Sequence, residues 1–184
     1  MTGVLERYEA LLAAGELRDD ADQRAAVERL DQLQSELEAT SERKGLLGKL
    51  RSRKAENPRG LYMWGGVGRG KSMLMDLFFE CLAIERKRRV HFHAFMLEVD
   101  KMIGEERKKH QEGPVRRVAA RIAEDVRCLA FDEMVVNNTA DAAIMARLFT
   151  ALIRDEGGTV VTTSNRPPHD LYKDGLNRSL FVPF

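Results

Sequence analysis

The feature that most constrains this 184-residue chain is a glycine-rich stretch between a short apolar run and a series of good helix formers. Residues 65–72 read G-G-V-G-R-G-K-S and match the template G-x-x-x-x-G-K-[ST] at every fixed position. Glycines let the backbone curl so that successive N–H groups point at an anion, and the next helix adds its unpaired N-terminal N–H groups. A turn that binds nothing is the alternative, but the strand–loop–helix context favours a phosphate-binding loop.

The loop has a defined set of expected ligand contacts. The residues expected to surround the phosphates of ATP are Gly65, Gly66, Val67, Gly68, Arg69, Gly70, Lys71 and Ser72. We expect Lys71 to reach the β- and γ-phosphates and the Ser72 hydroxyl to bind Mg²⁺. ATP and Mg²⁺ are therefore the expected cofactors.

A second motif, Phe131-Asp132-Glu133, closes an apolar run about sixty residues after the loop, where a Walker B strand is expected. Asp132 would contact Mg²⁺, directly or through water. Glu133 is the more informative residue, because ATPases that activate water need a general base at this point and simple kinases do not. An acidic pair in solvent at a strand end is the alternative reading.

Two further polar residues complete the expected catalytic set. The β-branched run 159–163 predicts a strand lying between the two motif strands, and Asn165 follows its end. Asn165 could orient the attacking water, although an asparagine there also suits an ordinary turn. Arg178 follows a short helix-like segment and could stabilise transition-state charge in a neighbouring subunit. Arg166 competes for that role, and Arg178 could also be a plain surface residue.

Strands alternating with helices predict a parallel α/β sheet flanked by helices, with the ligand outside the carboxyl ends of the strands. The pattern predicts a second strand at 90–95 and helices at 97–110, 115–125 and 139–154. Two helices precede this core, and the second carries an apolar stripe that packs on the domain body or on a partner chain. That stripe is Ala26, Leu30, Leu33 and Leu37. Residues 40–59 are expected to form a linker, so the division is 1–57 and 58–184.

Composition narrows the partners and the compartment. The net charge is +1, from 30 basic and 29 acidic residues, so the overall charge does not favour binding to nucleic acid. The basic groups at 86–89, 108–109 and 116–117 are expected to form solvated faces. Cys81 and Cys128 lie in apolar runs, which indicates a reducing compartment. His91 and His93 have no third ligand at recognisable spacing. Without a membrane-length apolar run or a targeting segment, we expect a cytoplasmic protein.

Several stretches together resemble the ZapE-type AAA+ ATPases, over nearly the whole chain. They are residues 60–72, 74–78, 91–96, 131–133, 163–168 and 170–176, with Tyr8, Gly15, Asp20, Gln23 and Leu30 near the start. The resemblance implies a P-loop NTPase of the AAA+ type that hydrolyses ATP, assembles into a ring or other oligomer, and acts in bacterial cell division at the FtsZ ring. Mitochondrial relatives are linked to protein quality control. By the same resemblance, Glu133 is the base and Asn165 is sensor one.

The chain departs from that family pattern at a few positions. Met134, Asn137, Asn138 and Asp100 differ from the usual residues, and none is a hydrolysis residue. Relatives continue through a fifth core strand and a helical lid, so a C-terminally truncated fragment is expected. Two other readings stay open: a nucleotide-gated loader acting on nucleic acid, and a scaffold that binds nucleotide without assembling a catalytic site.

Overall fold

The computed structural model describes residues 2–47, 58–109, 112–136 and 139–173. Within them, parallel strands form one sheet in the order β1-β4-β3-β2. The strands are β1 (Leu61–Trp64), β2 (Lys87–His91), β3 (Cys128–Asp132) and β4 (Thr159–Ser164). This arrangement confirms the parallel α/β prediction, and β4 lies between the two motif strands as expected.

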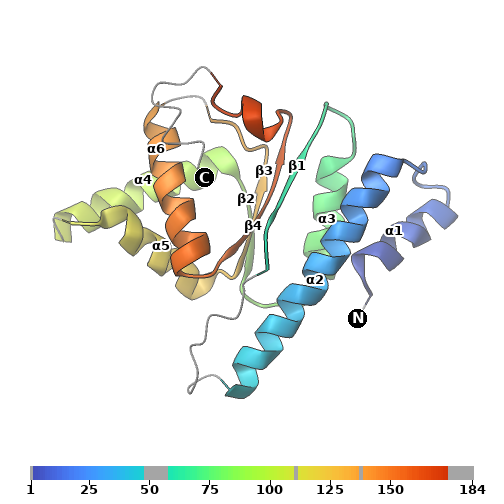
Figure 1. Ribbon diagram of the computed structural model, residues 1–184, viewed down its shortest axis with the longest axis horizontal. Helices are drawn as coiled ribbons and strands as arrows, with labels where there is room; N and C mark the ends of the chain where they lie inside the picture. Colours follow the sequence, from blue (N-terminus) through green and yellow to red (C-terminus); the bar gives the residue numbers. More distant parts are fainter. Residues whose placement is uncertain (1, 48–57, 110–111, 137–138, 174–184) are drawn as a thin grey trace.

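Helices cover both faces of the sheet, which stands between them in Figure 1. One layer contains α1 (Val4–Ala13), α2 (Ala21–Leu47) and α3 (Lys71–Cys81). The other contains α4 (Phe92–Lys109), α5 (Pro114–Asp125) and α6 (Thr139–Thr150), which continues into the π-helical turn η1 (Ala151–Asp155). A short 3₁₀ turn, η2 (Pro168–Asp170), follows β4. Helix α5 confirms the helix predicted at 115–125, and α6 with η1 confirms the one predicted at 139–154. Helix α4 corrects the third prediction, because it begins at Phe92 and not at residue 97.

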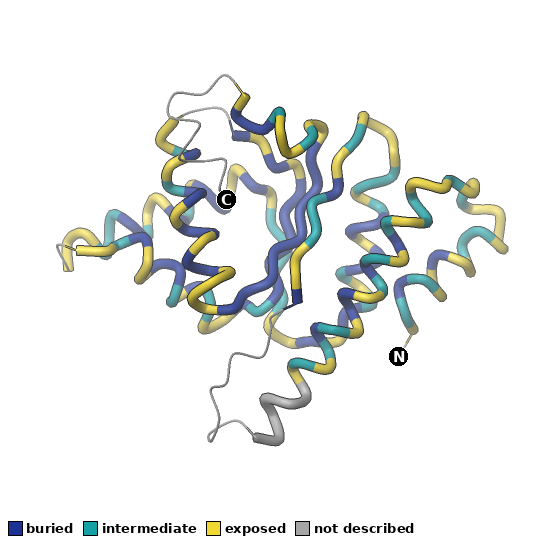
Figure 2. The backbone as a smooth tube through the Cα atoms, in the orientation of Figure 1, coloured by how far each residue is buried: buried dark blue, intermediate teal, exposed yellow. Residues whose placement is uncertain are grey.

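The core is divided by the sheet. β3 and β4 are buried along their whole length, which explains their nearly continuous apolar and β-branched sequences (Figure 2). On the α4–α6 face, Phe131 packs edge-on against Phe92, Phe95 and Phe149, with ring centroids 5.7, 4.8 and 5.5 Å away. Such aromatic pairs add specific geometry to the area they bury. This packing fixes β3 at Phe131, the residue directly before Asp132 of the second motif.

The N-terminal helices pack on this same body. Leu30, Leu33 and Leu37 are fully buried in one cluster with side chains of α3 and of the central strands, so the apolar stripe serves intramolecular packing. The buried Gln34 accepts a hydrogen bond from the Val4 N–H and donates to the Cys81 carbonyl, both at 3.1 Å. These bonds tie α1, α2 and α3 together. The division at residue 57 stays a prediction, although both sides of it share a core.

The prediction of a linker beginning at residue 40 is wrong. The second helix continues to Leu47, and the Thr40 hydroxyl donates to the Glu36 carbonyl at 2.6 Å, which accommodates its side chain within the helix. Charged and polar residues such as Lys, Glu and Arg are also good helix formers, so the polarity of this stretch does not distinguish a linker from a helix. Residues 48–57 lie outside the described part of the chain.

The second strand predicted at 90–95 is present, but its predicted bounds are wrong. The strand is the basic run Lys87–His91, and the chain turns helical at Phe92. The alternation at 90–95 misled because Phe92, Phe95 and Val99 also fit helical spacing, and all three are buried while His93 is exposed. Charged residues can form this strand because it lies at the sheet edge and finds partners on other elements.

Candidate nucleotide-binding site

The motifs meet at the carboxyl edge of the sheet. Trp64, the last residue of β1, pairs with Ser164, the last of β4, and Phe131 of β3 pairs with Thr162. The N–H of Gly65 donates to the Ser164 carbonyl at 3.3 Å, which fixes the start of the glycine-rich loop to the end of β4. In Figure 1 these strand ends and the start of α3 lie together at the top of the view. The fold therefore brings the two motifs and Asn165 to one edge.

The loop has the backbone conformation that its glycines predict. Gly68 and Gly70 have φ angles of 78° and 79°, a region that side chains with a Cβ rarely adopt. Lys71 opens α3, and its ammonium donates to the carbonyls of Gly65 and Gly66, each at 2.8 Å. The lysine side chain thus folds back over the start of the loop. Val67 at the loop tip is 86% exposed.

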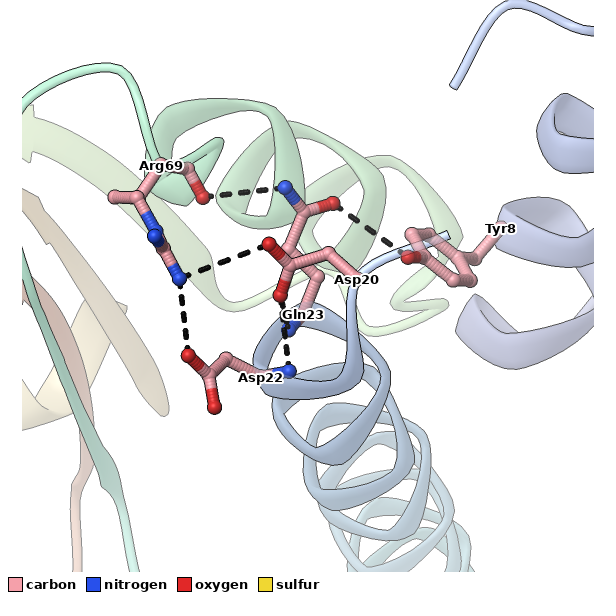
Figure 3. Close-up of polar contacts among 5 residues, drawn as sticks. All are labelled: Tyr8, Asp20, Asp22, Gln23 and Arg69. Carbon is pink, nitrogen blue, oxygen red and sulfur yellow. Dashed lines mark hydrogen bonds and ion pairs between the residues drawn. The ribbon is translucent and has the colours of Figure 1, made fainter. Parts of the chain in front are cut away.

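The loop is also held by the N-terminal helices, as Figure 3 shows. The Arg69 guanidinium pairs with Asp22 at 3.0 Å and with Asp20 at 3.6 Å. The Gln23 amide donates to the Arg69 carbonyl at 3.3 Å and accepts from the Tyr8 hydroxyl at 3.5 Å. Asp20 additionally caps α2 by accepting from the N–H groups of residues 22 and 23. Arg69 therefore serves the loop as an anchor, a role that sequence reasoning missed.

Asp132 ends β3 and is buried against a cation from the neighbouring strand. Its two carboxylate oxygens accept from Nε and Nη2 of Arg89 at 2.8 and 3.1 Å. Arg89 also pairs with Asp76 of α3. The pKa of Arg89 is raised above its ordinary value, mainly by the hydrogen bond to Asp132 and to a smaller extent by the one to Asp76. Sequence reasoning assigned Arg89 to a solvated basic face because it began the strand three residues too late.

Glu133 has a positive φ of 55°, unusual for a residue with a side chain. Its N–H donates to the Thr163 hydroxyl at 3.0 Å, and the N–H of Met134 donates to the Thr163 carbonyl at 2.8 Å. The Ser164 hydroxyl in turn donates to the Met134 carbonyl at 2.9 Å. The end of β4 therefore holds the chain reversal that presents Glu133, whose side chain is exposed. Strained backbone of this kind is concentrated at functional sites.

The other predicted residues are placed in part. Asn165 is exposed directly after β4, and Arg166 beside it accepts a hydrogen bond at its carbonyl from the Tyr62 hydroxyl at 2.8 Å. Arg178 lies outside the described residues, as do Asn137 and Asn138. Met134 is buried and Asp100 is exposed. The trans-acting arginine thus stays a prediction.

In the part of the chain that the structure describes, the other charged and metal-ligating residues form no second site. His91 ends β2 and His93 lies in α4, so they do not share a strand, and the described residues contain no cluster of three or more potential metal ligands. Lys87 donates to the carbonyls of Phe79 and Leu82, while Arg88 pairs with Glu98. This part of the basic run is thus structural. No helix in the described ranges is long and apolar enough to cross a membrane.

Sequence comparison places the chain among known proteins. The family model described as AFG1-like ATPase matches residues 2–184. The chain is 40% identical over 188 residues to Cell division protein ZapE of Escherichia coli K12, covering 96% of this chain and 49% of that protein. It is 46% identical over 145 residues to Lactation elevated protein 1 homolog B of Danio rerio, covering 72% of this chain and 28% of that protein. The chain thus spans about half the length of the ZapE proteins it matches.

Structural comparison agrees on the fold. AMPPCP-bound DnaA from Aquifex aeolicus superimposes with a TM-score of 0.52 at 18% identity, covering 89% of this chain and 44% of that one. A DNA replication initiation factor gives a TM-score of 0.50 at 17% identity, covering 89% of this chain and 44% of that one. The fold is that of the AAA+ P-loop ATPases. From the match along its whole length, the chain belongs to the AFG1-like ATPase family.

Proposed function

We propose that this chain is the nucleotide-binding core of a Mg²⁺-dependent ATPase that converts ATP to ADP and phosphate. The observation that carries the proposal is the convergence of the glycine-rich loop, the end of β3 and the end of β4 at one sheet edge. Ligands of open α/β sheets bind outside the carboxyl ends of the strands. Membership in the AFG1-like ATPase family supports the same reaction.

Residues 65–72 would cradle the phosphates. The left-handed Gly68 and Gly70 turn the backbone into a concave loop, and α3 directs its first N–H groups toward it. The Lys71 ammonium, now bonded to two loop carbonyls, would exchange these neutral acceptors for phosphate oxygens. That exchange favours the lysine–phosphate contact because a charged acceptor forms the stronger hydrogen bond.

Oxygen donors suited to Mg²⁺ lie at the same edge. Ser72 is exposed in the first turn of α3, and Asp132 ends strand β3. A hydroxyl and a carboxylate are the kind of ligands that Mg²⁺ takes beside nucleotide phosphates. When bound, Mg²⁺ would neutralise charge on the phosphates.

Hydrolysis would use the residues next to Asp132. We assign to Glu133 the removal of a proton from the attacking water, and to Asn165 the orientation of that water near the γ-phosphate. The reversal after β3, held by Thr163 and Ser164, fixes the backbone from which Glu133 projects. We assign the trans-acting arginine to Arg178, which requires self-association into a ring or another oligomer.

The test compares two substitutions in a full-length version of the protein. Lys71→Ala should abolish binding of a fluorescent ATP analogue, whereas Glu133→Gln should retain binding and block phosphate release. Glu80→Gln, an exposed glutamate near the opposite end of α3, is the matched control and should leave both readouts unchanged. Undiminished turnover by Glu133→Gln would overturn the general-base assignment, and normal binding by Lys71→Ala would overturn the phosphate site.

We further propose that the full-length protein works in the cytoplasm in cell division, on or near the FtsZ ring. The support is the 40% identity to a protein named for cell division. The test is co-sedimentation with FtsZ polymers, with and without ATP. Absence of nucleotide-dependent co-sedimentation, combined with ATPase stimulation by single-stranded DNA that falls with salt, would favour a nucleic-acid loader instead. The structural roles of Lys87, Arg88 and Arg89 argue against that alternative.

A further inference from the structure

Arg89 is a charged residue at the proposed magnesium site that the catalytic scheme does not use. It lies on the edge strand β2, opposite Ala130 of β3 in the parallel register. Residues two apart on a strand share a face, so Arg89 projects on the same side as Ala130 and Asp132. Ala130 packs in the cluster that contains α3, the helix that carries Asp76. The topology thus places one cation between carboxylates from two different elements.

The two carboxylates that Arg89 contacts differ in solvent exposure. Arg89 binds both oxygens of Asp132 in a bidentate contact, and the Asp132 side chain is 12% exposed. Asp76 holds the same guanidinium through Nη1, and its side chain is 53% exposed. A planar guanidinium suits such paired contacts, and they orient the carboxylate as well as neutralise it. Arg89 therefore has a second partner on the solvent side of the site.

We propose that Arg89 acts as a counter-ion that Mg²⁺ displaces: it holds the Asp132 carboxylate before the nucleotide binds, and when Mg²⁺ enters it releases Asp132 and stays paired with Asp76. The reason is competition for the same oxygens. A guanidinium bound to both oxygens of Asp132 repels a divalent cation and occupies the lone pairs that the cation, or its water, would use. Asp76 lowers the cost of the exchange because the arginine keeps an anionic partner. Arg89 is thus a positioning residue that sets the Mg²⁺ requirement of the site.

This inference rests on the proposed role of Asp132 in binding Mg²⁺, and it makes two predictions of opposite sign. Removing the competing cation with Arg89→Met should lower the Mg²⁺ concentration that half-saturates nucleotide binding. Removing the alternative partner with Asp76→Asn should raise that concentration, because among the described residues Asp132 is then the one carboxylate left to pair with Arg89. A merely structural arginine predicts lower stability in both variants without opposite shifts in Mg²⁺ requirement.

The experiment titrates Mg²⁺ into full-length protein mixed with a fluorescent ATP analogue and measures nucleotide binding at equilibrium. We expect about threefold or larger shifts, downward for Arg89→Met and upward for Asp76→Asn. Arg88→Met is the matched control, since Arg88 neighbours Arg89 on the strand but pairs with Glu98. Arg89→Lys should give an intermediate shift, because it keeps the charge and loses the two-pronged contact. Thermal unfolding of each variant establishes that it is folded.

The outcomes separate this inference from the function on which it rests. Nucleotide binding by the unsubstituted protein that is indifferent to Mg²⁺ would refute the assigned metal role of Asp132. If that binding depends on Mg²⁺ but the Arg89 and Arg88 variants shift alike, the counter-ion role is refuted. Shifts of Arg89→Met and Asp76→Asn in the same direction, or no shift in either, also refute it. Should Arg89→Met fail to fold, Asp76→Asn tests the exchange by itself, through the upward shift.

Discussion

Gly70→Ala is a sharp test of how the glycine-rich loop is built. Gly70 has a φ of 79° and is the residue directly before α3. A Cβ at this position would lie 2.9 Å from Nε2 of Gln23, the atom that donates to the Arg69 carbonyl. The substitution therefore strains the backbone and also displaces the side chain that ties the loop to α2.

Two contributions lower the stability of the Gly70→Ala protein, and a third offsets part of that loss. A left-handed conformation costs a residue with a Cβ roughly 1–2 kcal/mol. Displacing the Gln23 amide removes an exposed hydrogen bond of 3.3 Å, which contributes about 0.5 kcal/mol. Alanine lowers the entropy of the unfolded chain, which offsets roughly 0.4–1 kcal/mol. We therefore expect Gly70→Ala to lower the free energy of unfolding by about 0.5–2 kcal/mol.

Denaturant unfolding measures this loss, and two further variants isolate its causes. In a Gln23→Ala background, the Gly70→Ala loss should shrink by about 0.5 kcal/mol, because that hydrogen bond is already absent. Gly104→Ala is the control of opposite sign: Gly104 lies inside α4 with open space around its Cβ position, so alanine should stabilise by about 0.5–1 kcal/mol. A Gly70→Ala protein as stable as the unsubstituted one would refute the assigned loop conformation.

Two other predictions concern the buried strand β3, which ends at the site. Phe131→Ala should lower the free energy of unfolding by about 3–5 kcal/mol, because Phe131 is fully buried among three aromatic rings. Phe131→Leu should lower it by less than half of that amount. Equal losses for the two variants in denaturant unfolding would contradict the packing argument. Burial raises the pKa of the Cys128 thiol from 9.0 to about 12. The folded protein therefore holds this proton more tightly than the unfolded chain does. The resulting contribution to the free energy of unfolding is fully present below pH 9 and is lost as the pH rises toward 12. Unfolding measured against pH should show that fall, and Cys128→Ala should flatten it; an unchanged slope would contradict the linkage.

Local signals in the chain were sufficient for much of this fold. The glycine-rich loop is readable because its left-handed glycines and the following helix lie within eight residues, 65–72. The strands β3 and β4 can be predicted because both faces of each are buried, so their sequences are apolar or β-branched up to the last residue, Asp132 or Ser164. Parallel strands separated by helices then require the motif-bearing ends to meet at one edge. The placement of Asp132, Glu133 and Asn165 at that edge follows from sequence.

Elements whose partners lie far away in the chain could not be predicted from local patterns. The basic run Lys87–His91 forms an edge strand because its arginines find carboxylates on other elements, Asp132 for Arg89 and Glu98 for Arg88. Without those partners the run resembles a solvated face, and the apolar alternation after it resembles a strand. The second helix likewise continues past the break expected at residue 40, and its apolar face up to Leu37 packs in the cluster that also contains α1 and α3.

The contacts around the site follow the same rule. Arg69 could be counted as a loop residue from sequence, but its anchors, Asp20 and Asp22, lie almost fifty positions earlier. The positive φ of Glu133 depends on Thr163, thirty residues later, which supplies the hydrogen-bond acceptors for the reversal. The chemical groups of the site and the sheet edge at which they gather can therefore be predicted from the chain, because motif spacing and apolar patterning are local properties. Which charge faces which follows from the tertiary structure, because ion pairs join residues that only folding brings together.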